Sequence, residues 1–102
     1  MKLKPGDKLV TIQSFRESGL IHYSAPVTGS FECDIAIGTV FAVVSEPREG
    51  YPGFYVMPVE AEEFERCHVP TAERKSKKYS GYSFVFMTSA IGKKYDLYHD
   101  DD

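Results

Sequence analysis

The chain has 102 residues, of which 42% are apolar and 14% aromatic, and its formal charge at pH 7 is −3. This length suits one domain with a single core, and the composition excludes an intrinsically disordered chain. The charge excludes a basic field over the whole surface, so any contact with nucleic acid or an anionic membrane has to be local. We expect one domain over residues 1–98 and a disordered acidic tail at residues 99–102.

The first predicted strand is residues 8–15 (KLVTIQSF), because apolar side chains recur there with a period of two. Residues 17–19 (ESG) indicate a reversal of the chain. Residues 20–25 are the expected return strand, which Pro26 ends. Residues 27–34 (VTGSFECD) are expected to form a loop or a short extra strand.

The strongest pattern in the sequence is a β-hairpin over residues 37–59. Two runs rich in β-branched and aromatic residues, IGTVFAVV and FYVMPV, flank the connector SEPREGYPG. Such runs are typical of largely buried strands, and a connector with two prolines and two glycines is typical of an exposed loop.

After the hairpin, residues 60–66 (EAEEFER) predict one helical turn anchored by Phe64, and residues 67–69 are read as a short strand. Residues 71–78 are polar throughout and favour a solvated connection or a short exposed helix. Residues 79–87 (YSGYSFVFM) predict a strand, and residues 93–98 predict an edge strand.

Five to seven short strands with almost no helix favour a mainly β fold: a small, strongly curved antiparallel sheet or barrel with one short helical turn near 60–66. The order of long hairpin, helical turn and short strand is similar to that of the SH3-like barrels over roughly two thirds of the chain. This resemblance concerns architecture alone and implies no particular function.

A catalytic or metal site finds little support in the sequence. Cys33, Cys67, His22, His68 and His99 could nominally supply a thiol nucleophile and a base, but the sequence contains no phosphate loop, dinucleotide fingerprint or zinc-ligand spacing. We interpret Cys67 as a small buried residue and His68 as a surface residue. No cofactor and no metal are expected, and an enzyme stays the least favoured alternative.

A second alternative is nucleic-acid binding. The cluster RKSKK followed by tyrosines combines cations for phosphates with rings for bases. Its residues are Arg74, Lys75, Lys77, Lys78, Tyr79 and Tyr82.

The favoured function is protein–protein interaction through the hairpin loop, because rigid aromatic and prolyl side chains on an exposed loop are typical anchors for a peptide. The candidate residues are Arg48, Tyr51, Pro52, Phe54 and Tyr55. The absence of an apolar export segment in residues 1–7 favours the cytoplasm and reduced thiols. Self-association through an edge strand is a further expectation.

Overall fold

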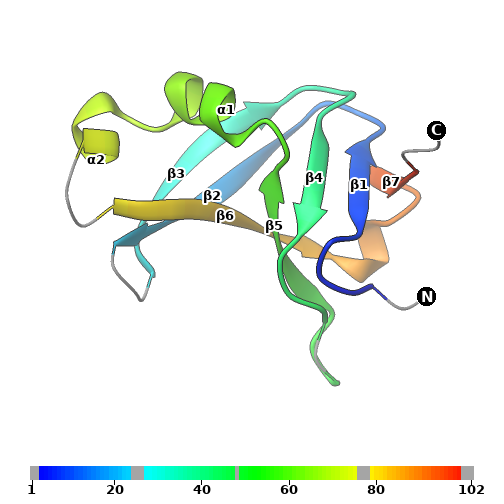
Figure 1. Ribbon diagram of the computed structural model, residues 1–102. Helices are drawn as coiled ribbons and strands as arrows, with labels where there is room; N and C mark the ends of the chain where they lie inside the picture. Colours follow the sequence, from blue (N-terminus) through cyan, green and yellow to red (C-terminus); the bar gives the residue numbers. More distant parts are fainter. Residues whose placement is uncertain (1–2, 24–26, 48, 76–78, 100–102) are drawn as a thin grey trace.

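The computed structural model describes residues 3–23, 27–47, 49–75 and 79–99, and these residues form one antiparallel sheet of seven strands (Figure 1). The strands are β1 (Lys8–Thr11), β2 (Phe15–Tyr23), β3 (Val27–Ile35), β4 (Val40–Val43), β5 (Gly53–Pro58), β6 (Tyr79–Met87) and β7 (Tyr95–Tyr98). The helices are α1 (Ala61–His68), α2 (Thr71–Lys75) and a 3₁₀ turn at Thr88–Ala90. The predicted mainly β fold is therefore confirmed.

The strand order is β3-β2-β6-β5-β4-β1-β7, so β3 and β7 are the two edges. Within the described residues no ladder joins these edges, and the sheet is not closed. A closed barrel is therefore not confirmed, whereas the predicted edge strand near residues 93–98 corresponds to β7. His99 follows β7 and is exposed. Residues 100–102 of the predicted acidic tail lie outside the described residues.

The predicted hairpin is confirmed as β4 and β5. Phe41 pairs with Pro58, and Val43 with Val56, in an antiparallel register. The predicted strand at residues 79–87 coincides with β6, which pairs with β5 on one side and β2 on the other. The longest apolar runs of the sequence therefore form the centre of the sheet.

The predicted reversal at residues 17–19 is wrong, because these residues lie in the middle of β2. Gly19 faces Phe31 of β3 on one side and Phe84 of β6 on the other. A Cβ at Gly19 would collide with the ring of Phe31, so the glycine gives the ring room against the backbone instead of making a turn. The chain changes direction earlier, between Thr11 and Phe15.

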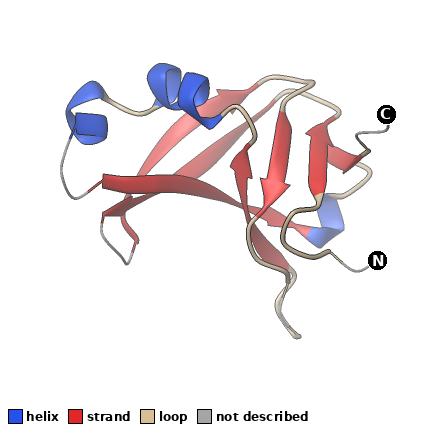
Figure 2. Ribbon diagram, viewed as in Figure 1, coloured by secondary structure: helices blue, strands red, loops and turns tan. Residues whose placement is uncertain are grey.

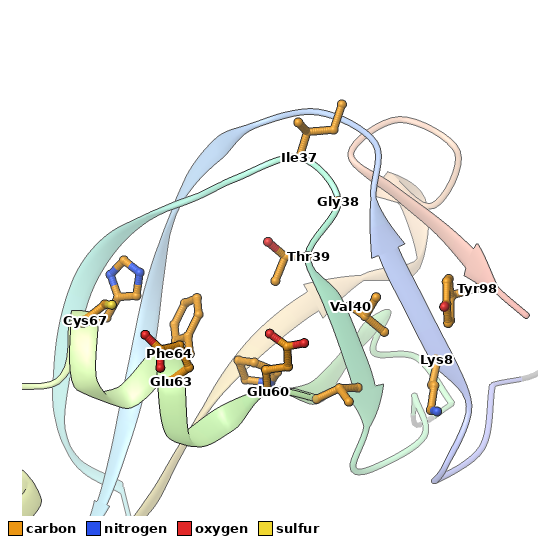
Figure 3. Close-up of a pocket in the computed structure, with 13 residues that line it drawn as sticks. Lys8, Ile37, Gly38, Thr39, Val40, Glu60, Glu63, Phe64, Cys67 and Tyr98 are labelled. Atoms are coloured by element: carbon orange, nitrogen blue, oxygen red, sulfur yellow. The ribbon is translucent and has the colours of Figure 1, made fainter. Parts of the chain in front are cut away.

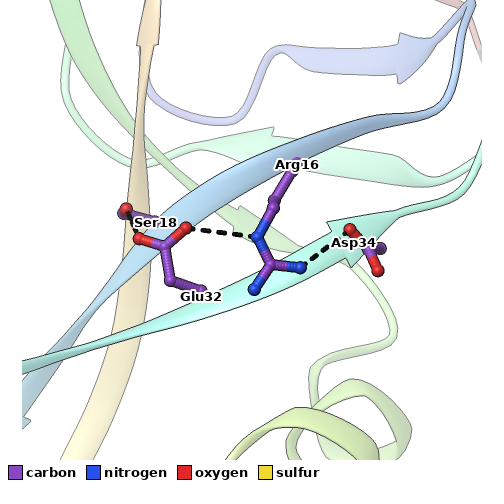
Figure 4. A network of polar contacts seen from close by, with 4 residues as sticks. All are labelled: Arg16, Ser18, Glu32 and Asp34. Carbon is purple, nitrogen blue, oxygen red and sulfur yellow. Dashed lines mark hydrogen bonds and ion pairs between the residues drawn. The ribbon is translucent and has the colours of Figure 1, made fainter.

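Residues 27–34, expected as a loop or a short strand, belong to the nine-residue strand β3. Cys33 and Ile35 are buried in the core, whereas Glu32 and Asp34 face outward. On this outward face Arg16 of β2 lies between the two carboxylates: its Nε is 3.5 Å from Glu32 and its Nη1 is 3.1 Å from Asp34 (Figure 4).

The hydroxyl of Ser18 completes this network by donating a hydrogen bond to Glu32 (Figure 4). All of these side chains are exposed, so each ion pair contributes at most about 1 kcal/mol. The outer face of the β2–β3 ribbon is thus polar, and its charged side chains pair with one another.

The predicted strand at residues 67–69 is also wrong, because α1 continues through His68. Phe64 holds the helix against the sheet, with its ring 5.8 Å from that of Tyr82 and 5.7 Å from that of Phe84. Cys67 is consequently exposed on the helix, not buried in a strand. The region after Pro70 begins with the short helix α2, one of the two predicted outcomes.

Aromatic rings dominate the core, which lies on one face of the sheet. Phe41 and Phe86 are fully buried with ring centroids 4.9 Å apart, and Phe86 stacks on Tyr95 at 4.1 Å. The buried hydroxyl of Thr11 donates to the carbonyl of Ala36 at 2.8 Å. The helices α1 and α2 lie together at one end of the sheet, away from the 3₁₀ turn (Figure 2).

Candidate functional site

The outer face of the β4–β5 hairpin is apolar, unlike the outer face of β2–β3. Alternate residues of both strands point into the core and are buried. The residues between them point outward, and we call this set the hairpin face: Val40, Ala42, Val44, Tyr55, Met57 and Val59. Each is partly or largely exposed. An apolar surface over neighbouring strands is typical of a protein-binding site.

A cavity of about 500 Å³ lies at the loop end of the hairpin face. Tyr51 and Tyr55, which are 51% and 38% exposed, line it together with Val44 and Pro5. Ser45, Glu46 and Gly53 complete the lining. We call this the loop cavity. It offers two aromatic rings, two aliphatic walls and one carboxylate to a ligand.

Backbone contacts hold the walls of the loop cavity in place. The N–H of Val44 donates to the carbonyl of Tyr55 at 2.8 Å, and the hydroxyl of Ser45 accepts from the N–H of Tyr55 at 3.3 Å. A Cβ at Gly53 would lie 2.8 Å from the ring of Tyr51, so the ring packs directly on the glycine backbone. The cavity is therefore preorganised, which lowers the entropic penalty of binding.

The predicted protein-binding residues that the structure describes lie partly on the surface and partly in the core. Tyr51, Pro52 and Tyr55 are exposed, and Tyr51 and Tyr55 meet at the loop cavity. Phe54 is 1% exposed and packs its ring against Phe86 at 6.4 Å, so it belongs to the core. Arg48 lies outside the described residues.

A second cavity, of about 510 Å³, lies at the opposite end of the hairpin face, between α1 and the turn that precedes β4 (Figure 3). We call it the helix groove. Residues 37–40 and 58–60 line it, together with Lys8, Tyr98 and one face of α1. That face consists of Glu63, Phe64, Cys67 and His68.

The helix groove was not predictable from local patterns in the sequence, because its walls come from five segments. The signal that could have found the α1 wall is the spacing of Glu63, Phe64, Cys67 and His68, which places these side chains on one face of a helix. Reading residues 67–69 as a strand removed that signal.

The helix groove gathers the residue types that the enzyme alternative required: His68 and Cys67 with the carboxylates of Glu60 and Glu63. Two of these groups are already engaged, however. Glu63 forms an ion pair with Arg66, with 3.3 Å between its Oε2 and the Nη1 of the arginine. The ring centroid of His68 lies 4.2 Å from that of Phe64. Across the described part of the chain no three His, Cys, Asp or Glu residues are grouped to hold a metal ion. We assign no catalytic role to this groove.

The remaining candidate nucleophile and bases lie apart from both cavities. His22 shares a hydrogen bond of 2.9 Å with the hydroxyl of Ser83. Cys33 is free and buried in the core, and burial, followed by the nearby carboxylate of Asp34, raises the pKa of its thiol to about 11. This thiol is protonated at neutral pH and is a poor nucleophile.

Of the residues of the nucleic-acid alternative, the structure describes the side chains of Arg74, Lys75 and Tyr82. Tyr82 is 1% exposed, and its hydroxyl donates to the carbonyl of Ala61 at 3.1 Å, so its ring cannot stack on a base. Arg74 donates to the carbonyl of Val69 and to the hydroxyl of Thr71, both at 3.1 Å. Lys75 is exposed. Lys77, Lys78 and the side chain of Tyr79 lie outside the described residues.

The chain was compared with protein-family models, with curated proteins and with solved structures. None matches. Among the described residues, the helices all fall short of the length and apolar character that a membrane crossing requires.

Proposed function

We propose that this protein is a non-catalytic binding domain that captures another protein through the loop cavity. The observation that carries the proposal is the meeting of two exposed tyrosines, Tyr51 and Tyr55, with Val44 and Pro5 in one preorganised cavity. Tyrosine is enriched among the residues that dominate binding energy at protein interfaces, since it offers a large rigid area at small entropic penalty.

The contrast between two regions of the outer face supports this choice of surface. On β2–β3 the outward side chains pair with one another, as Arg16 does with Glu32 and Asp34. On β4–β5 the outward side chains are apolar and contribute Val44 and Tyr55 to the cavity. Water solvates the first surface well and the second poorly, so a partner gains more by covering the second.

We propose an open, curled sheet of the SH3-like kind, for which the support is the approach of Phe15 in β2 to Tyr95 in β7. Their ring centroids are 6.2 Å apart although four strands separate β2 from β7 in the sheet order. The proposed compartment is the cytoplasm, for which the support is the free thiols of Cys33 and Cys67.

The test is affinity capture with the purified domain, followed by measurement of the affinity for each captured protein after its purification. We expect Tyr51→Ala and Tyr55→Ala each to weaken direct binding by about tenfold or more. The matched control is Ile12→Ala, which removes an exposed apolar side chain outside both cavities. Unchanged binding by the double variant Tyr51→Ala/Tyr55→Ala, with an unchanged amide NMR spectrum, would refute the proposal.

A further inference from the structure

The loop cavity and the helix groove lie at the two ends of one continuous apolar strip. The strip consists of three cross-strand rows of the hairpin face: Val44 beside Tyr55, Ala42 beside Met57, and Val40 beside Val59. The first row lines the loop cavity, and the last row lines the helix groove. The end rows are four positions apart along β4, so the strip is about 13 Å long.

Most of the exposed large apolar side chains line one of the two cavities. Eight large apolar residues of the described chain are exposed. Three of them, Val44, Tyr51 and Tyr55, line the loop cavity. Three others, Ile37, Val59 and Tyr98, line the helix groove. One ligand that spans the strip would cover both groups.

The backbone of the hairpin restricts what kind of ligand can lie on the strip. β4 pairs with β1 and β5, and β5 pairs with β4 and β6, so neither strand has a free edge under the strip. An extended segment lying there would find no backbone partners and would bury unpaired N–H and C=O groups. A helix satisfies its own backbone and presents an apolar stripe to a sheet, as helices do in layered folds.

Acidic side chains lie at both ends of the strip and favour the same kind of partner. Glu46 lines the loop cavity, and Glu60 and Glu63 line the helix groove. Within the described residues neither Glu46 nor Glu60 forms an ion pair. Lys8, which pairs with Ala42 of the middle row, is the one Lys or Arg among the described residues that line either cavity. A partner with basic residues at both ends of its apolar stripe therefore complements the surface. A second copy would instead bring acidic ends to a surface that already carries them.

We infer that the hairpin face binds an amphipathic helix of a partner protein, with an apolar stripe of about nine residues and a basic residue near each end. This inference rests on the proposed function and names its partner class. Tyr51 and Tyr55 contact one end of the helix, Met57 its middle, and Val59 and Glu60 its other end.

The probe for the test is a set of synthetic peptides of about 15 residues, long enough to form a helix on binding. The first carries Leu and Met on one helical face, Lys near each end and uncharged polar residues elsewhere. The second has the same composition in an order without a continuous apolar face, and the third has Glu in place of Lys. Fluorescence anisotropy measures affinity, and amide NMR shifts locate the binding surface.

We expect the first peptide to bind at least tenfold more tightly than either control peptide, with shifts over both cavities and the residues between them. Met57→Glu and Val59→Lys each weaken its binding by about tenfold. Glu46→Lys and Glu60→Lys each weaken it about threefold or more, and more at low salt than at high salt. The matched control Glu32→Lys, on the polar β2–β3 face, leaves it unchanged.

Three results would overturn the inference. One is equal binding of the peptide without a continuous apolar face. Another is dimerisation of the domain through the hairpin face in analytical ultracentrifugation. The third is binding that Tyr51→Ala abolishes while Met57→Glu and Val59→Lys, both folded, leave it intact. That third result would leave the proposed function standing with the loop cavity as the whole site, whereas failure of the proposed function requires that the tyrosine variants bind the captured partner normally.

Discussion

The hydroxyl of Tyr95 binds both backbone groups of Met87: it accepts a hydrogen bond from the N–H at 2.7 Å and donates one to the carbonyl at 3.0 Å. Tyr95 begins β7 and Met87 ends β6, and the sheet order places three strands between β6 and β7. One side chain therefore joins two regions that no ladder joins directly. Its ring also stacks on Phe86 in the core.

We predict that Tyr95→Phe keeps the fold but lowers the free energy of unfolding by about 1–3 kcal/mol, because two part-buried backbone groups lose their partner. Urea denaturation measures the change. Tyr98→Phe, which alters an exposed tyrosine of the same strand, is the control. Equal midpoints for wild type and Tyr95→Phe would mean that water replaces the hydroxyl without loss.

A second prediction concerns the glycine in the middle of β2. Gly19→Ala introduces a methyl group where the ring of Phe31 lies, and this ring also packs edge-on against Tyr82 and Phe84 at 5.9 Å. We expect a loss of about 1–3 kcal/mol in the free energy of unfolding, typical of an overfilled core. Thermal unfolding checks it. The double variant Gly19→Ala/Phe31→Leu should recover part of the loss, and its failure to do so would place the strain elsewhere.

Gly19 also explains where sequence analysis succeeded and failed. The hairpin and β6 were predictable because long apolar runs alternate in burial with a period of two. Gly19 sits in a local turn signal, but its place is decided by Phe31, a residue in another strand that no local pattern identifies. β3 was hard to recognise because its first four residues, VTGS, are mostly small or polar and include a glycine, so only its second half alternates between apolar and polar residues.

The candidate site, like the fold, was predictable from the sequence only in part. Tyr51 and Tyr55 follow from the composition of an exposed loop. Pro5 and Val44 join them only through the pairing of distant segments, and the helix groove depends on α1 continuing to His68. Phe54 is an aromatic residue of the kind that often anchors a partner at a surface. Its position in the register of β5, opposite Phe86, places it in the core instead.

The two cysteines should differ in reactivity. Cys33 is 4% exposed with a pKa raised to about 11, whereas Cys67 is exposed on α1. At pH 7.5 we expect one fast-reacting thiol in the native protein and a second one only after denaturation. Labelling with iodoacetamide and peptide mass spectrometry identify each site. Modification of Cys33 at the rate of Cys67 would show that the β2–β3 ribbon opens readily.

Glu17 should make stability depend on pH. It lies on the same face of the β2–β3 ribbon as Cys33, and burial raises the pKa of its carboxyl above 4.5, a rise that the charge of Lys94 partly offsets. The folded protein therefore holds this proton more tightly than the unfolded chain does, and the ionised carboxylate weakens the fold as pH rises through the raised pKa.

We predict that Glu17→Gln is more stable than wild type at pH 7 and that the difference disappears below the usual carboxyl value of 4.5. Thermal unfolding across this pH range measures the difference directly. Glu49→Gln, at an exposed loop position, should track the wild type throughout. A stabilisation by Glu17→Gln that grows toward acid would contradict a raised carboxyl pKa in the folded protein.

The loop cavity depends on the absence of a side chain at residue 53. Gly53→Ala should displace the ring of Tyr51 and remove one wall of the cavity, since the new methyl group would lie 2.8 Å from that ring. We expect weaker partner binding, by about three- to tenfold, with little change in stability. Tyr51 ring NMR signals report the displacement. Weaker partner binding with unchanged Tyr51 ring signals would show that the loss of affinity does not come from a displaced Tyr51 ring.

The place of β1 in the sheet has a consequence for biosynthesis. β1 pairs with β4 on one side and with β7 on the other, where Lys8 faces Tyr98. One of the two neighbours of β1 is therefore synthesised long after it, and contacts between such distant residues form slowly. The nascent domain carries a half-paired, apolar β1 until residues 95–98 emerge. The sheet is thus complete only after β7 has emerged, and until then the exposed strand can pair with the wrong segment or with another nascent chain.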